Sequence, residues 1–315
     1  MSGSRSRAVV AEEGGSSGFA LAVVLFFVLA VAAFITPLVL GARTDFLVAS
    51  NKLQQDRLVM VAEGVVTVLA RTLAATPVDA PGPELTLRSV PLRCEMRTLT
   101  VEVRLQDQYG LVDLNSAESG LLQAGFEALG FERETAERLA ETAIAFRLPP
   151  EQDGERPDVD AGTIVGGLKK RPFEATEEVY DFQGLRGTPA RAIAETFTIY
   201  NRRPTILGPQ MPQRLSRILP VAPSPTYPFV VEENTEDLTR TYRIDVSVTD
   251  SDGGAKGFAG AIVTAGGDGS GNFDVLERVQ SPEILPEEAP DFGTAIGCDR
   301  LLGVGAATFL AAAPG

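Results

Sequence analysis

The stretch FALAVVLFFVLAVAAFITPLVL, from Phe19 to Leu40, decides how the rest of this sequence is interpreted. It holds no charged side chain, and no charge occurs anywhere between Glu13 and Arg43. A helix of this length spans roughly 33 Å at about 1.5 Å per residue, which is enough to cross the hydrocarbon core of a bilayer. A helix buried in a soluble core would carry a polar stripe, and this run has none. The sequence therefore predicts a membrane-spanning segment.

A cleaved secretory signal is the alternative interpretation of this run. Its apolar region is normally about 7–15 residues long and ends in a cleavage site of the Ala-x-Ala type. The run here is longer, and Gly41-Ala42-Arg43 just after it makes a poor site. The apolar run is instead preceded directly by Gly18.

An amphipathic pattern continues beyond the apolar run. Apolar residues recur at three- and four-residue steps from Leu53 to Leu73, with charged and amide side chains between them. No proline interrupts residues 38–76, although Pro37 is expected to bend the helix. We therefore expect one helix from about Phe19 to about Ala75, roughly 85 Å long. Its first half is apolar all round, and its second half has a single apolar face.

The composition excludes several classes of function. The 315 residues contain no histidine, which excludes Ser-His-Asp and Cys-His catalysis and histidine-ligated zinc. The net charge of −14 would repel a phosphate backbone, so we expect no binding to nucleic acid. The two cysteines, Cys94 and Cys298, form no Cys-x-x-Cys motif. No constellation of residues supports catalysis, and we expect a protein that is not an enzyme.

The middle of the chain predicts strands followed by pairs of helices. Apolar and polar residues alternate over 85–90 and 99–105, as in half-buried strands. Asn115-Ser116, followed by Glu118, is typical of the N-terminal cap of a helix, and a second helix is expected from Arg133 to about Arg147. Another helical pair is expected over 171–200, joined by a hairpin at 184–187, with Pro189 in the first turn of its second helix.

The last third of the chain returns to strands. A Gly/Pro-rich linker is expected over 203–228, and alternation then predicts a strand over Thr241–Asp250. A partner strand through Phe258 and a third strand over 272–279 follow. The apolar stretch Leu301–Ala313 is too short to span a membrane. For this tail, disorder and docking on a partner both stay open.

The sequence around the N-terminal end of the apolar run resembles the N-terminal region of the type IV prepilins and pseudopilins. A short polar leader ends in Gly18, and Phe19, a wholly apolar stretch and an amphipathic continuation follow. The resemblance implies that a prepilin peptidase cuts between Gly18 and Phe19 and methylates the new amino terminus on Phe19. Two features depart from the family pattern: the basic residues Arg5 and Arg7 lie far from the cut, and Val23 stands where the family has glutamate.

Within these proteins the chain is most similar to the protein K family of type II secretion, whose members are large minor pseudopilins lacking that glutamate. In that family the glutamate carboxylate neutralises the amino terminus of a neighbouring subunit in lipid. A subunit at the filament tip has no neighbour above it and therefore needs no such glutamate. That family is also similar in carrying a YG-hLNhN-S segment and two SAM-like helical units inserted into the pilin sheet. The matching segments here are Tyr109-Gly110, Leu114-Asn115-Ser116, Pro172-Phe173 and Phe182–Leu185.

The resemblance, which covers roughly residues 15–280, implies an α+β fold. A long N-terminal pilin-like helix packs on a small antiparallel sheet, with an inserted all-helical domain of two SAM-like or helix-hairpin-helix units. The expected divisions are a prepilin leader at 1–18, transmembrane and amphipathic parts of the helix at 19–41 and 42–76, first strands at 84–107, the inserted domain at 108–202, a linker and C-terminal strands at 203–280, and a tail, disordered or docked, at 281–315.

Two features allow more than one interpretation. Members of the resembling family can bind calcium near the inserted domain, and an acidic loop here offers oxygen ligands; a solvated loop without metal is the alternative. The candidate ligands are Asp153, Glu155, Asp158 and Asp160. In an oxidising compartment Cys94 and Cys298 would form one long-range disulfide, or stay as a core thiol and a surface thiol.

The function implied by the resemblance is that of a non-catalytic minor pseudopilin at the tip of the type II secretion pseudopilus. It would cross the bacterial inner membrane once, with its C-terminal domain in the periplasm. There it would help initiate or cap the filament that drives export of folded proteins across the outer membrane. Expected partners are the other minor pseudopilins of the I, J and H types, the major pseudopilin, the inner-membrane assembly platform, the prepilin peptidase and membrane lipid.

Two alternatives belong to other classes of protein. One is a membrane-anchored DNA-binding protein of an uptake system, because Phe182–Phe197 looks like a helix-hairpin-helix, which binds the DNA backbone through hairpin amides. Residues 116–200 hold 9 basic and 16 acidic residues, which argues against phosphate binding. The other alternative is a minor pilin of a type IV pilus that acts in adhesion.

Overall fold

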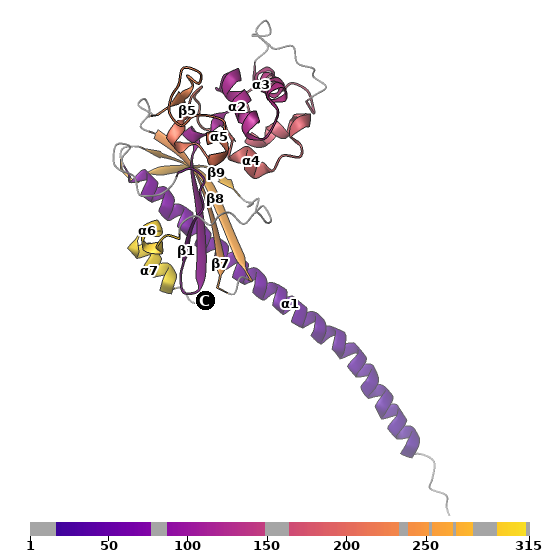
Figure 1. Cartoon of the computed structure of the whole chain (residues 1–315). Helices are drawn as coiled ribbons and strands as arrows, with labels where there is room; N and C mark the ends of the chain where they lie inside the picture. The colour runs from indigo at the N-terminus through magenta and orange to yellow at the C-terminus, as the bar shows by residue number, and fades with distance from the viewer. Residues whose placement is uncertain are drawn as a thin grey trace, which may run out of the picture. The chain divides into compact units, whose positions relative to one another are not determined.

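The computed structural model describes residues 17–76, 87–148, 164–232, 239–251, 254–266, 269–279 and 295–312. The chain forms two compact units, Met1–Gln54 and Gln55–Gly315. Helix α1 (Ser17–Ala74) is continuous through both (Figure 1). Its bounds agree within two residues with the single helix expected over 19–75, so that prediction is confirmed.

A five-stranded antiparallel sheet forms the centre of the second unit (Figure 1). Its strands follow the order β1-β2-β7-β8-β9. The longest ladders join β2 to β7 and β7 to β8, with Asp107 opposite Tyr242 and Val248 opposite Gly257. The strands are β1 (Leu92–Glu95), β2 (Leu99–Asp107), β7 (Thr239–Asp250), β8 (Lys256–Gly266) and β9 (Phe273–Val279).

One apolar core lies between this sheet and the C-terminal half of α1. The alternation predicted for the strands is confirmed, because every second residue of β2 and β7 is buried. The helix contributes the face that its three- and four-residue spacing predicts. The fully or nearly fully buried members include Leu58, Ala62, Leu69 and Leu73 from α1 and Val101, Val103, Ile244, Val246 and Val263 from the strands.

A second core belongs to the sequence inserted between β2 and β7. This inserted domain leaves the sheet after Asp107 and returns at Thr239. Its first helices, α2 (Ser119–Ala128) and α3 (Arg133–Arg147), lie where the sequence predicts them, and α3 has the predicted bounds. The remaining elements are 3-10 helices η1 (Gln108–Gly110), η4 (Thr176–Asp181), η5 (Gln183–Leu185) and η6 (Gly208–Gln210), helices α4 (Ala190–Ala194) and α5 (Gln213–Ser216), and strands β3 (Val112–Asp113), β4 (Phe197–Thr198), β5 (Ile206–Leu207) and β6 (Val230–Val231).

The boundaries expected for the inserted domain are wrong at its C-terminal end. Met211, Leu215 and Val230 lie in the same core as α2 and α3, so the domain continues well past residue 202. The Gly/Pro-rich stretch expected to be a linker lacks periodicity because its elements are only a few residues long. Single apolar side chains from this stretch are nevertheless buried in the core of the inserted domain.

The inserted domain is also not all-helical. β3 pairs in parallel with β4, and β5 pairs in parallel with β6. In place of the second helical pair, η4 and η5 are 3-10 turns and only the five-residue α4 is an α-helix. Gly184, Gly187 and Pro189 fall within a short interval there, which limits how far an α-helix can run.

The first strand of the sheet is displaced from its expected place. In the described part of 85–90, Arg88 makes one isolated bridge with Gln106, and the strand β1 begins at Leu92. Ser89 has a φ of 60°, which interrupts extended backbone, and Pro91 follows soon after. These two residues explain why the alternating pattern did not become a strand.

The tail after β9 contains two helices, α6 (Cys298–Leu302) and α7 (Val304–Ala312). Leu301 and Leu302 are buried in the same core as α1 and the sheet. The expectation of a disordered tail, or one docked on a partner, is therefore corrected for residues 295–312. These residues dock on the chain's own sheet.

Candidate functional site

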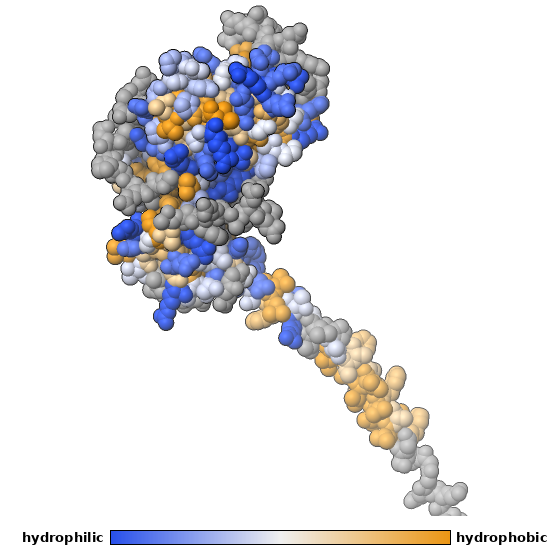
Figure 2. Space-filling model, viewed as in Figure 1, coloured by the Kyte–Doolittle hydropathy of each residue, from blue (hydrophilic) through white to orange (hydrophobic). Residues whose placement is uncertain are grey.

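The N-terminal half of α1 carries the largest exposed apolar surface among the described residues. The helix is long and apolar enough to cross a membrane, and none of its most apolar window is buried inside the molecule. Figure 2 shows this part of α1 in the colour of apolar residues. Exposed positions include Phe19, Leu21, Phe26, Phe27, Leu29, Phe34 and Ile35, with Phe19 75% and Phe34 77% exposed.

Such a surface requires a partner or a lipid environment. Leaving one large apolar side chain in water rather than burying it costs roughly 1.5–3 kcal/mol, and this helix exposes many in succession. All backbone hydrogen bonds of a helix are internal, so it can enter lipid without leaving polar groups unpaired. The surface is therefore suited to a bilayer or to the apolar sides of neighbouring helices.

The predicted processing position lies at the N-terminal border of this helix. α1 begins at Ser17, and Gly18 is the next residue of the helix. Residues 1–16, which form most of the expected leader, lie outside the described residues. Cleavage between Gly18 and Phe19 stays a prediction.

Asn115 connects the two halves of the inserted domain. Its side-chain nitrogen donates to the Phe173 carbonyl at 3.0 Å, and its oxygen accepts from the Phe173 N–H at 2.7 Å. The side-chain amide of Asn115 thereby pairs with both backbone groups of Phe173, as the backbone of a neighbouring β-strand does. The helix-capping role expected for Asn115-Ser116 is wrong, since α2 has Glu118 at its N-cap position.

Asp113 and Arg147 hold the turn that precedes α2. Asp113 Oδ1 accepts from the backbone N–H groups of Asn115 and Ser116, each at 2.8 Å, and its Oδ2 accepts from the Arg202 N–H. The Arg147 guanidinium donates to the carbonyls of Leu114 and Ala117, both at 2.6 Å. Burial lowers the pKa of Arg147, and the Asp113 carboxylate acts in the opposite direction. The YG-hLNhN-S segment is thus a structural junction.

The two chain segments that connect the inserted domain to the sheet are bonded to each other, and we call this connection, formed around Asp107, Tyr109 and Thr239, the neck. At its start, Asp107 Oδ1 accepts from the Tyr109 N–H at 2.9 Å and caps η1. The Tyr109 hydroxyl then donates to the carbonyl of Thr239, the first residue of β7, at 3.0 Å. The Arg203 guanidinium carbon lies 5.3 Å from the centre of the Tyr109 ring. The two ends of the insertion are therefore joined side by side.

Asp107 is a fully buried carboxyl group in this neck. Burial raises its pKa to about 6, although the Tyr109 N–H and the Arg240 charge both act to lower it. Its Oδ2 atom has no hydrogen-bond partner among the described residues. Burial and the Asp107 charge together raise the pKa of Tyr242, its neighbour across the ladder, to about 12.

Further contacts fix the inserted domain against the sheet. The Tyr200 hydroxyl donates to Glu277 Oε2 in β9 at 2.6 Å, and burial together with this bond raises the pKa of Tyr200 above its ordinary value. Near β1, Arg88 Nε donates to the Met211 carbonyl at 2.9 Å. These bonds favour one orientation of the inserted domain on the sheet.

The calcium site stays a prediction, and the hairpin of the DNA-binding alternative is partly exposed. At the hairpin, Gly184, Arg186 and Gly187 are exposed, whereas Leu185 is buried in the core. The acidic loop falls within 149–163, so its four candidate calcium ligands, Asp153, Glu155, Asp158 and Asp160, lie outside the described residues. Among the described residues, no group of three His, Cys, Asp or Glu side chains could hold a metal ion.

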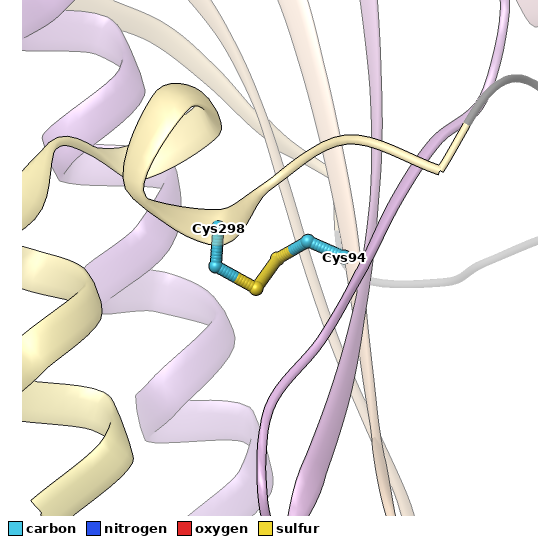
Figure 3. The surroundings of a disulfide bond; sticks show 2 residues. All are labelled: Cys94 and Cys298. Atoms are coloured by element: carbon cyan, nitrogen blue, oxygen red, sulfur yellow. A yellow bond between two sulfur atoms is a disulfide. The ribbon is translucent and has the colours of Figure 1, made fainter.

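Cys94 and Cys298 are joined by a disulfide (Figure 3). Their Cα atoms lie 5.1 Å apart although 204 positions separate them in the sequence. Cys94 belongs to β1, and Cys298 is the first residue of α6. The bond therefore ties the tail to the edge strand of the sheet.

Sequence reasoning missed Asp107, Asp113 and Arg147 as key residues. A signal was present for Asp113, because it interrupts the apolar run Leu111-Val112-Asp113-Leu114, whereas Asp107 stands between two glutamines and gave none. Arg147 gave no signal, since a basic residue at the end of a helix is common without any further role.

The comparisons with known proteins agree with this architecture. No protein-family model and no curated protein matches the chain. A solved chain does match, from the GspK-GspI-GspJ complex of the enterotoxigenic Escherichia coli Type 2 Secretion System, with a TM-score of 0.51 and 12% identity. The match covers 74% of this chain and 99% of that chain. At this identity the likeness establishes a pseudopilin-like fold.

Proposed function

We propose that this protein is a minor pseudopilin of a type II secretion system, of the protein K type. The observation that carries the proposal is the difference in environment between the two halves of α1. Its N-terminal half exposes an uninterrupted apolar surface, while its C-terminal half supplies one side of the core of an antiparallel sheet. A pseudopilin needs both features, since the same helix anchors it in the membrane and packs between subunits.

In this proposal the role is mechanical and non-catalytic. The apolar half of α1 holds the precursor in the inner membrane, and the second unit lies in the periplasm. After removal of the leader, α1 packs beside the helices of other minor pseudopilins and of the major pseudopilin on the assembly platform. The likeness to a chain from a GspK-GspI-GspJ complex supports partners of this kind.

Placement at the filament tip is supported by the inserted domain. It has its own core and is bonded to the sheet through Tyr109–Thr239 and Tyr200–Glu277. A rigid domain of that size would obstruct a further subunit stacked on the same end. Val23 also introduces no carboxylate that would require a neighbouring amino terminus.

Complementation of a deletion strain tests the proposal. Loss of the gene should leave exported proteins folded in the periplasm, and the wild-type gene should restore their release. Val28→Asp should not restore it, because a charge at the helix centre costs roughly 2.5–3.5 kcal/mol on insertion scales, whereas Val28→Leu should. Normal secretion in the deletion strain, combined with salt-dependent DNA binding by the full chain in detergent, would instead favour the uptake protein.

A further inference from the structure

The C-terminal segment 295–312 lies along the edge of the sheet. Ala295 forms a parallel bridge with Arg93, and the Ile296 N–H donates to the Arg93 carbonyl at 3.0 Å. The segment therefore extends the hydrogen bonding of β1, which is one of the two edge strands of the sheet. Unpaired edge strands readily bond to other chains, so this coverage protects the sheet at the β1 edge.

The same segment also closes the apolar core. Leu301 is 2% exposed and Leu302 is 4% exposed, and both belong to the core shared by α1 and the sheet. The disulfide from Cys298 to Cys94 fixes this arrangement covalently (Figure 3). The remaining buried core residues come from α1 and from the four strands β1, β2, β7 and β8, and these strands are bonded to one another without the segment.

The two cysteines of the disulfide differ in exposure. Cys94 is 1% exposed and stands opposite Val101 in the β1–β2 ladder. Cys298 is only partly buried, and its neighbours Gly297 and Asp299 are exposed. Thiol–disulfide exchange depends on which sulfur an external thiolate can reach. Access therefore favours attack at Cys298.

We propose that residues 295–312 form a redox-controlled clasp over the β1 edge, in which Cys298 exchanges with external thiols and Cys94 is the buried partner. Oxidation locks the clasp, and reduction releases it while the rest of the fold stays intact. The proposal does not depend on the function proposed above, because it rests only on the contacts of the segment.

The opening reaction is an ordinary exchange with a dithiol reductant. A thiolate of the reductant bonds to Cys298 Sγ, the Cys94–Cys298 bond breaks, and Cys94 leaves as a thiolate that takes up a proton. The second thiol of the reductant then attacks the mixed disulfide and frees Cys298. Two electrons and two protons pass to the protein, and the dithiol becomes a disulfide.

Hydrogen exchange of the full chain in detergent micelles, with and without dithiothreitol, tests the clasp. We expect amides of 295–312 and of β1 to exchange at least about tenfold faster after reduction, because local opening exposes them. Amides of β7, β8 and α3 should exchange at unchanged rates. Unchanged exchange in 295–312, or faster exchange throughout the molecule, would overturn the proposal.

A double variant and a trapping experiment complete the test. Cys94→Ala/Cys298→Ala should exchange like the reduced wild type whether or not dithiothreitol is present. Brief treatment of the wild type with glutathione, followed by acid quenching, should place the glutathione on Cys298. Glutathione found on Cys94 would contradict the assigned order, and a double variant that exchanges like the oxidised wild type would contradict the lock.

Discussion

Gly257 of β8 lies directly against the backbone of Leu58 in α1. A Cβ atom placed on Gly257 would collide with the Leu58 carbonyl carbon and the Val59 nitrogen, and it would come within 2.6 Å of the Leu58 Cβ. Because Gly257 has no side chain, the backbone of the strand can approach the helix closely at this point. The backbone of α1 therefore lies against the backbone of β8 at this position.

Replacing Gly257 should therefore weaken the packing of α1. Gly257→Val forces helix and strand apart, and overpacking of this kind costs typically about 1–3 kcal/mol. Urea unfolding in detergent, followed by circular dichroism, measures the loss. The matched control is Gly64→Ala on the exposed side of α1, where nothing lies within 4 Å of the added Cβ. It should stabilise the helix by roughly 0.5–1 kcal/mol, and equal losses in both variants would contradict this account.

Asn115 should be essential for joining the two halves of the inserted domain. Asn115→Ala leaves the buried Phe173 N–H and carbonyl unpaired at this point, and each such loss costs roughly 1–3 kcal/mol. Asn115→Asp keeps an oxygen that accepts from the Phe173 N–H but loses the donor to its carbonyl. We expect the aspartate variant to unfold at an intermediate urea concentration. An alanine variant as stable as the wild type would show that the paired bonds contribute nothing.

Gly125 and Phe197 should behave as a coupled pair. A Cβ on Gly125 would lie 2.7 Å from a carbon of the Phe197 ring, so Gly125→Ala should destabilise the inserted domain. Phe197→Leu alone leaves part of a cavity, but it also makes room for the methyl group. In a double-mutant cycle measured by urea unfolding, we expect a favourable coupling of about 0.5–3 kcal/mol. Strict additivity would mean that the backbone shifts to relieve the contact.

Asp107 should make the stability of the neck depend on pH. Its pKa is raised to about 6 in the folded protein, so the folded state binds this proton more tightly than the unfolded chain. The stabilisation that comes from this tighter proton binding is fully present below pH 3.8, the ordinary pKa of the group. It is lost as the pH rises to about 6. Asp107→Asn cannot titrate and should lack this loss.

The measurement for Asp107 is the difference in unfolding free energy between Asp107→Asn and the wild type at pH 4, 5, 6 and 7. This difference should change in favour of the asparagine variant by at most about 3 kcal/mol as the pH rises. It should be constant above about pH 6. A difference that is flat with pH, or one that changes in favour of the wild type, would contradict the assignment.

Periodicity allowed the regular elements to be predicted. The C-terminal half of α1, the bounds of α3 and the strands β2, β7 and β8 follow from residues whose spacing shows which side is buried, and the N-terminal half of α1 follows from its unbroken apolar composition. Such patterns are local, so they can be recognised in one segment at a time. They also predicted helices between two groups of strands, and the resemblance to the protein K family implied that these helices form an insertion.

Long-range contacts could not be predicted in this way. Met211 and Leu215 join the core of the inserted domain from a Gly/Pro-rich stretch in which no period is visible. The Cys94–Cys298 disulfide, which spans 204 positions, was one of two alternatives for these cysteines, and no local pattern decided between them or showed that the tail docks on the sheet. Asn115 has the composition of a helix cap, but its partner is the backbone of Phe173.

The mass of the amino-terminal peptide of the protein recovered from membranes tests the proposed function most directly. In cells that contain a prepilin peptidase, we expect the chain to begin at N-methylated Phe19. A Gly18→Val control in the same cells should retain Met1, since the resemblance to the prepilins places the cut directly after this glycine. A wild-type protein that keeps Met1, or one that begins beyond residue 40, would contradict the assignment as a pseudopilin.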